Sequence, residues 1–129
     1  LCQDLGIDFY TVAHGKCYSA AADILCLGTK GCRIAVPHTT IMLHPLSFGL
    51  EQDYAGQQKK ATEFCQKQSE YFNKLVAEGC NKDQPRKYKQ FLEDIEQGLW
   101  LTAVEAKKYG IVDKIDNLSN ILKFSENGV

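Results

Sequence analysis

Three side chains of this sequence have the types that nucleophilic hydrolysis needs: a hydroxyl, an imidazole and a carboxylate. Ser19 stands before three alanines, whose high helix propensity predicts that a helix begins there. A helix start offers unpaired amides, so the Ala20 amide could hold the oxyanion that forms when a Ser hydroxyl attacks an acyl group. His44 ends an apolar run and could accept the Ser19 proton, and Asp94, on a helix with an apolar stripe, could orient the imidazole.

Each of these residues also has an ordinary structural interpretation. Ser is a common N-cap, and an Asp on a helix is usually solvated. His14, at the end of the first predicted strand, and His38, in a predicted turn after Pro37, are rivals of His44 for the role of base. The residue types alone therefore leave the chemistry open.

The first third of the chain predicts three strands and one helix. β-branched and aromatic residues indicate strands at Ile7–Ala13 and Arg33–Val36, and a third apolar run covers Thr40–His44. The run Ser19–Leu27 predicts a helix that Gly28 ends. This order of elements fits an α/β layer architecture, with the candidate hydroxyl and imidazole near strand ends.

Helical patterns dominate the next part of the chain. From Glu51 to Glu78 apolar residues recur mostly at steps of three, four or seven, which predicts an amphipathic helix about 40 Å long. Such a helix either projects to meet a partner subunit or lies as a solvated surface helix. After a break at Gly79–Pro85, helical spacing resumes over Arg86–Gln97.

A further helix has sequence signals at both of its ends. Thr102 and Glu105 form a capping-box pattern at its start, and Gly110 can close it. Beyond it, Ile111–Ile115 predicts a short strand, and the polar tail from Asn117 is expected to fray.

The composition is that of one globular domain. The 129 residues are 44% hydrophobic and 24% charged, so we expect a single domain over 1–129 with a modest core. The net charge of −1 argues against a general nucleic-acid binder, and no apolar stretch approaches the roughly 18 residues of a membrane span. Because the chain begins at Leu1 and its only methionine is Met42, we expect a further segment upstream.

Six cysteines raise the question of a metal site or a disulfide framework. No C-x-x-C pair occurs and no two histidines have the spacing of zinc ligands, so we expect no metal site. A thiol among apolar residues behaves as a small hydrophobe. We therefore expect reduced core cysteines and a reducing compartment, either the cytoplasm or an organelle matrix or stroma. The cysteines with apolar neighbours are Cys17, Cys26, Cys65 and Cys80.

Four blocks follow one another along the chain, Gly15–Ala22, Gly28–Arg33, Ile41–Pro45 and Leu101–Ile115. Together they resemble the serine block, the histidine block and the block after the catalytic Asp in the proteolytic subunit of Clp-type proteases. Counting back from the last block matches the family's Asp to Asp94. The separations of 25 and 50 residues agree with the family's order of Ser, His and Asp.

The resemblance implies a crotonase-like layered α/β fold with a long projecting handle helix, matched by residues 51–78. It implies peptide-bond hydrolysis in which Ser19 attacks, His44 carries the proton, Asp94 orients His44 and the Ala20 amide is one oxyanion donor. It also implies rings of seven subunits, which stack in pairs or include related subunits, and which receive unfolded proteins from an ATP-driven unfoldase. It implies no metal or other cofactor, no nucleic acid and no membrane.

Some positions depart from the family's pattern. The second oxyanion amide belongs to a Gly-rich loop that would precede Leu1. Tyr18 and Pro45 flank the candidate serine and histidine where other residues are usual. Gln97 and Gly98 stand where an Arg-Asp pair usually supports contact between two rings.

Three other interpretations stay open. A noncatalytic relative could complete a mixed ring as a structural subunit, although the presence of all three residue types speaks against it. A crotonase-type acyl-CoA enzyme would share the fold. A membrane-linked Ser-Lys peptidase of related fold would use a lysine such as Lys16 or Lys30 as its base.

Overall fold

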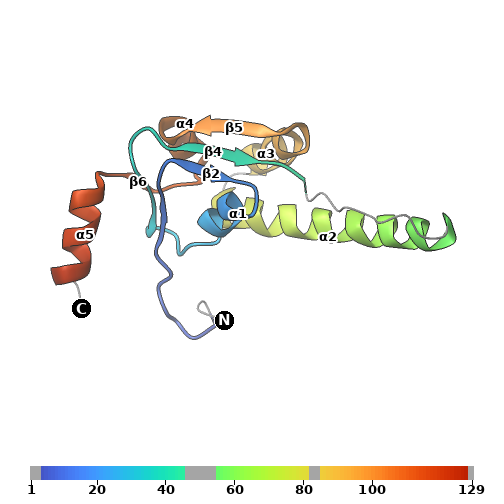
Figure 1. Ribbon diagram of the computed structural model, residues 1–129, viewed down its shortest axis with the longest axis horizontal. Coiled ribbons are helices and arrows are strands. Elements are labelled where there is room, and N and C mark those ends of the chain that lie inside the picture. Colours follow the sequence, from blue (N-terminus) through green and yellow to red (C-terminus); the bar gives the residue numbers. More distant parts are fainter. Residues whose placement is uncertain (1–3, 46–54, 82–84, 128–129) are drawn as a thin grey trace.

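The computed structural model describes residues 4–45, 55–81 and 85–127. Within these residues the strands form two three-stranded sheets, and helices pack around them (Figure 1). The α/β layers and the long helix agree with the predicted fold class. Figure 1 shows the long helix α2 leaving the body of the molecule on one side and the C-terminal helix α5 lying on the other.

The first sheet is parallel and has the order β1-β3-β6. Its strands are β1 (Thr11–Ala13), β3 (Arg33–Ala35) and β6 (Lys114–Ile115). All three strands are shorter than the sequence pattern suggests. In the C-terminal segment, Ile111 and Val112 are buried ahead of β6 rather than paired within it.

The second sheet has the order β2-β4-β5 and contains two strands that the sequence analysis did not predict. Its strands are β2 (Lys16–Tyr18), β4 (Thr40–Leu43) and β5 (Leu99–Thr102), with β4 parallel to β2 and antiparallel to β5. The chain passes from the first sheet to the second between β1 and β2, where Gly15 has φ +71°, a value that favours glycine.

Helix α1 (Ala20–Cys26) lies where the alanine run predicts it. Gly28 follows the end of this helix, as expected, but it serves close packing. A Cβ at Gly28 would stand 2.4 Å from Thr11 Oγ1, so only glycine allows β1 to approach the helix end this closely. Thr11 Oγ1 in turn donates a hydrogen bond to the carbonyl of Leu25, at 3.1 Å.

Helix α2 (Ala55–Asn81) confirms the long helix, and residues 51–54 of that prediction lie outside the described part. The break predicted over Gly79–Pro85 is present but starts later than expected, because α2 continues through Gly79 to Asn81 and the next helix begins at Pro85. A Cβ at Gly79 would lie 3.0 Å from the Cys26 carbonyl oxygen, so glycine here lets α2 pack directly on α1. Only the last turns of α2 are buried in the core, whereas Phe64 and Tyr71 are each 61% exposed.

The remaining helices are α3 (Pro85–Gln97), α4 (Ala103–Tyr109) and α5 (Leu118–Asn127). The predicted capping box is present, since the Thr102 hydroxyl accepts from the Glu105 amide and the Glu105 side chain bonds the Thr102 amide. Gly110 closes α4 in the left-handed conformation. The expected fraying after Asn117 is wrong, because α5 forms there.

The cysteines that the structure describes are all free thiols. Cys17, Cys26, Cys32 and Cys80 are buried and Cys65 is half-buried, while Cys2 lies outside the described residues. No three His, Cys, Asp or Glu side chains gather as a metal site would require in the part of the chain described. Nor does any described helix combine the length and the apolar character of a membrane span.

A buried ion pair ties three parts of the fold together. Arg33, on β3, is 1% exposed, and its Nη2 lies 2.7 Å from Asp113 Oδ1. Arg33 Nε also donates to Asp113 Oδ2 at 2.9 Å, and Nη1 donates to the Gly79 carbonyl on α2 at 3.1 Å. Burial opposes the charge on Asp113, but the hydrogen bonds from Arg33 hold the pKa of this carboxyl below its usual value.

We expect Asp113→Asn to lower the free energy of unfolding by about 3 kcal/mol at pH 7, because it leaves the buried Arg33 charge unpaired. Since the pKa of Asp113 is lowered by folding, its stabilisation is present above about pH 4 and is lost as the pH falls through the folded pKa. Urea unfolding of the parent protein and of Asp113→Asn between pH 3 and pH 7 measures the difference between their free energies of unfolding. The exposed pair Lys89–Glu93 supplies the control, since Glu93→Gln should change stability by less than about 0.5 kcal/mol. Equal stability of Asp113→Asn and the parent at pH 7 would contradict the role of the pair.

Candidate active site

The register of β2 against β4 brings Ser19 and His44 to the same edge of the second sheet. Tyr18 pairs with Met42 in this parallel ladder, and the Ser19 amide extends it by donating to the Met42 carbonyl at 2.8 Å. His44 is the residue directly after β4. Because the carboxyl ends of parallel strands share one edge, two residues 25 positions apart in sequence become neighbours.

Ser19 forms a strained turn between β2 and α1. It has φ 57° and ψ −130°, in a region that a residue with a Cβ seldom occupies. It stands at the N-cap position of α1, yet its side chain makes no capping hydrogen bond. The Ser19 hydroxyl is therefore free to bond another group, and the role of this serine is not simply that of a helix cap.

That partner is His44. Ser19 Oγ and His44 Nε2 lie 2.8 Å apart, and both residues are half-buried. The rival histidines are elsewhere: His14 and His38 are both exposed, and His38 has its own left-handed backbone with φ 68°. An imidazole in hydrogen-bond contact with a serine hydroxyl can act as the base for nucleophilic attack.

The first turn of α1 supplies backbone donors beside the hydroxyl. The Ser19 carbonyl accepts from the amides of Ala22 and Asp23, at 2.8 and 3.0 Å, and so starts the helix. Ala20 is the first residue of α1, and the amide of a first residue has no acceptor within its own helix. This amide and the positive end of the helix dipole can stabilise a negative oxygen formed next to Ser19.

Asp94 lies in the last turns of α3, near the same end of the sheet. The pairing of Leu43 with Leu99 brings the end of α3 toward the end of β4. The Asp94 carboxylate has two other partners, since Oδ2 accepts from the Tyr109 hydroxyl at 2.7 Å and Oδ1 accepts from Gln90 Nε2 at 2.9 Å. Among the described residues no hydrogen bond joins Asp94 to His44. The hydrogen bond to Asp94 raises the pKa of Tyr109.

A second carboxyl group, which the sequence analysis did not single out, is buried close to the pair. Asp23 lies on the inner face of α1, one turn beyond Ser19, and is 8% exposed. Burial raises the pKa of Asp23 to about 6, and the nearby charge of His44 offsets part of this rise. The signal in the sequence is an acidic residue in an otherwise apolar helix, between Ala22 and Ile24.

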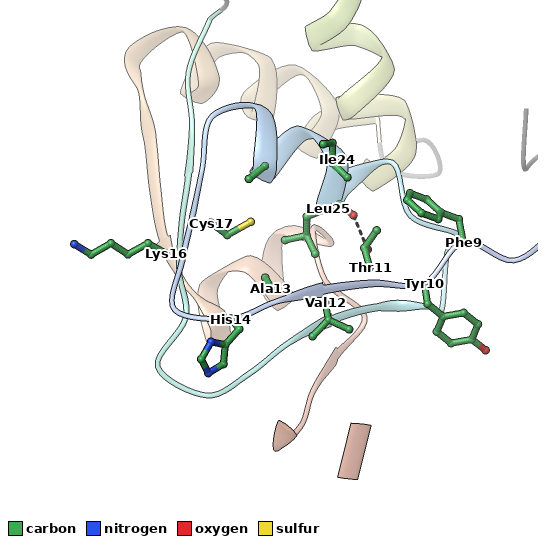
Figure 2. Close-up of a pocket in the computed structure, with 11 residues that line it drawn as sticks. Phe9, Tyr10, Thr11, Val12, Ala13, His14, Lys16, Cys17, Ile24 and Leu25 are labelled. Atoms are coloured by element: carbon green, nitrogen blue, oxygen red, sulfur yellow. Dashed lines mark hydrogen bonds between the residues drawn. The ribbon is translucent and has the colours of Figure 1, made fainter. Parts of the chain in front are cut away.

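A hollow of about 390 Å³ lies between β1 and α1 (Figure 2). Thr11 and Ala13 point from β1 toward α1 in this view, while Tyr10 and Val12 point away from it. Neither Ser19 nor His44 lines the hollow, so it is separate from the hydroxyl–imidazole pair.

Comparison with known proteins identifies the family. The sequence model of the family described as Clp protease matches residues 3–118. The ATP-dependent Clp protease proteolytic subunit of Porphyromonas gingivalis is 31% identical over 113 residues, which cover 88% of this chain and 49% of that protein. The ATP-dependent Clp protease proteolytic subunit 2 of Corynebacterium diphtheriae is 35% identical over 108 residues, covering 84% and 52% respectively.

The chain thus spans about half the length of the curated relatives that it matches. The family match extends from before β1 to the start of α5, and so includes both sheets and the strand ends that carry the hydroxyl and the imidazole. By its sequence, this chain belongs to the Clp protease family.

Proposed function

We propose that this chain is part of a serine peptidase subunit that cleaves peptide bonds of unfolded proteins within a Clp-like complex. The observation that carries the proposal is the 2.8 Å contact between Ser19 Oγ and His44 Nε2, made by a serine that is strained and does not cap its helix. A crotonase-type acyl-CoA enzyme would not need such a pair. A Ser-Lys peptidase would need a lysine in contact with this hydroxyl, whose hydrogen bond is to an imidazole.

In the proposed reaction the Ser19 hydroxyl donates its proton to His44 Nε2 and attacks the carbonyl carbon of the substrate. The tetrahedral oxyanion accepts a hydrogen bond from the Ala20 amide, and His44 returns the proton to the leaving amine. An acyl-enzyme remains on Ser19, and a water molecule, deprotonated by His44, then releases it. No step needs a metal or an organic cofactor.

Asp94 is the carboxylate that we propose for the third role, which is to orient His44 and stabilise its charged form. In the described conformation each of its oxygens accepts one hydrogen bond, from Tyr109 and from Gln90, and each can accept a second. Tyr109 therefore links the orientation of the Asp94 carboxylate on α3 to the position of α4.

The assembly that we propose is a ring of seven subunits, stacked in pairs or completed by related subunits, fed by an ATP-driven unfoldase. Support comes from α2, which projects from the body of the molecule and exposes Phe64 and Tyr71 along its length. Apolar side chains on a projecting helix favour contact with another subunit. The buried free thiols favour a reducing compartment, such as the cytoplasm or an organelle matrix or stroma.

A fluorophosphonate probe tests the nucleophile. We expect the probe to label Ser19 in the assembled protein, as located by peptide mass spectrometry, and Ser19→Ala to abolish the labelling. We expect His44→Gln to slow labelling by about 1000-fold or more, because it removes the base. Ser119→Ala, His14→Gln and His38→Gln are the matched controls and should label like the parent. An assembled protein whose Ser19 stays unlabelled would support the noncatalytic structural subunit instead.

The third role is tested by comparing Asp94→Asn with Tyr109→Phe. We expect Asp94→Asn to lower kcat by about 100-fold or more, since the imidazole loses its orienting carboxylate. Tyr109→Phe keeps the ring contact with Phe91 but frees Asp94 Oδ2, so we expect kcat to rise by about fivefold. Peptide hydrolysis at saturating substrate gives both values. A Tyr109→Phe variant that loses activity as Asp94→Asn does would show that the hydrogen bond between the two residues is itself required.

A further inference from the structure

The outer face of the second sheet carries an apolar row at the end where Ser19 and His44 meet. The register pairs Tyr18 with Met42 and Met42 with Trp100, so their side chains lie across the three strands on one face. Tyr18 and Met42 are half-buried, and Trp100 is 60% exposed. Their neighbours along the strands are buried in the core instead: Cys17, Ile41, Leu43, Leu99 and Leu101. We call the outer row, Tyr18, Met42 and Trp100, the aromatic platform.

The two rings of the platform are already arranged to receive a third ring. β2 and β5 lie on either side of β4, so their axes are roughly 9–10 Å apart. The rings of Tyr18 and Trp100 nevertheless meet edge to face, with their centroids 5.2 Å apart, and therefore lean toward each other over Met42. Rings held in this way on a sheet lose little conformational entropy when they bind a ligand. Because Trp100 remains largely exposed, its ring is open to a further aromatic contact.

The platform is continuous with the hydroxyl–imidazole pair. Ser19 directly follows Tyr18, and its amide donates to the Met42 carbonyl at 2.8 Å. His44 lies two residues after Met42, and Pro45 restricts the residue before it to an extended conformation, so strand alternation places the two side chains on the same face. Two residues of a strand span about 7 Å, which is also the spacing of alternate side chains in an extended peptide. A peptide bound at Ser19 can therefore place a neighbouring side chain on the platform.

The surroundings of the platform leave room for such a side chain and confine the apolar surface to this row. Gly98 directly precedes Leu99, the partner of Leu43, and so lies beside the end of β4. A Cβ at Gly98 would meet none of the described atoms within 4 Å beyond its chain neighbours, so the space next to Trp100 is open. The row on the other side of the platform, farther from Ser19, is polar: Lys16, Thr40 and Thr102.

We infer that the aromatic platform is a substrate-binding subsite, which takes an aromatic side chain of the peptide within two residues of the bond that Ser19 attacks. The inference rests on the proposed function and adds to it the substrate class, namely segments of unfolded chain with an aromatic residue beside the cleavage site. Ring–ring contacts favour an aromatic side chain over an aliphatic one of similar hydrophobicity. The competing occupant is a neighbouring subunit that would cover the platform.

Trp100 is the only tryptophan of the sequence, so its fluorescence measures binding to the platform directly. The probe is a peptide with one para-nitrophenylalanine, whose ring quenches tryptophan on contact, and the matched peptide has leucine at that position. We expect the probe alone to quench Trp100 saturably in the assembled Ser19→Ala protein, which cannot cleave it. Adding Tyr18→Ala should weaken this binding about tenfold, and Tyr18→Phe, which keeps the ring, should preserve it. Val104→Ala, which removes an exposed apolar side chain outside the platform, is the control.

Peptide hydrolysis provides the second readout. In Tyr18→Ala and Trp100→Ala we expect kcat/KM to fall about tenfold for a peptide with phenylalanine beside the cleaved bond, and to change less than about twofold for the matched leucine peptide. Both variants should still label Ser19 with fluorophosphonate.

Two results would overturn the inference: equal losses for the two peptides, or a Trp100 emission that the probe leaves unquenched. Dissociation of the assembly by Trp100→Ala in analytical ultracentrifugation would also overturn it, since the platform would then belong to a contact between subunits. Failure of the proposed function looks different: Ser19 of the parent protein would resist fluorophosphonate, while the quenching of Trp100 would still be measurable.

Discussion

The parallel pairing of β2 with β4 is the constraint on which the proposed chemistry depends. Both strands are short, yet their register fixes Tyr18 opposite Met42, and the first residue after each strand, Ser19 after β2 and His44 after β4, contributes a hydroxyl and an imidazole that are in contact. A shift of one residue in this pairing would turn every side chain of one strand to the opposite face. The core side of the sheet, with Ile41 and Leu43 fully buried, resists such a shift.

Two features near this edge of the sheet raise the free energy of the folded state. Ser19 adopts a backbone conformation that costs on the order of 1–3 kcal/mol for a residue with a Cβ. Asp23 adds a buried acid without a hydrogen bond, whereas the other buried charge nearby, Arg33, is fully matched by Asp113 and by a backbone carbonyl. The buried charge of Arg33 is thus paired, whereas the carboxyl of Asp23 has no hydrogen bond from the described residues and lies near the strained Ser19. Both unfavourable contributions to folding stability fall beside the site where charge changes during the proposed reaction.

Much of this arrangement could be predicted from the sequence, and the rest could not for physical reasons. The capping box at Thr102 and the alanine run after Ser19 are local signals, and both predict helices that the structure contains.

The short strands β2 and β5 could not be predicted, because strands of three and four residues are defined by their partners rather than by their own pattern. The sequence predicts that the helix breaks from Gly79 onward, whereas α2 continues to Asn81 and Gly79 allows the close contact of α2 with α1. The hydrogen bonds of Asp94 with Tyr109 and Gln90, and the burial of Asp23, depend on tertiary packing that no spacing along the chain reveals.

The central claim is that Ser19 and His44 act on one substrate carbonyl, and a peptidyl chloromethyl ketone tests it most directly. Its carbonyl carbon accepts the Ser hydroxyl, and its methylene then alkylates an imidazole nitrogen with loss of chloride, so one molecule must reach both groups. We expect mass spectrometry of the assembled protein to find the label on His44, and replacement of Ser19 by Ala to prevent it. Alkylation of His14 or His38 instead, or equal alkylation of His44 with and without the Ser19 hydroxyl, would contradict the account.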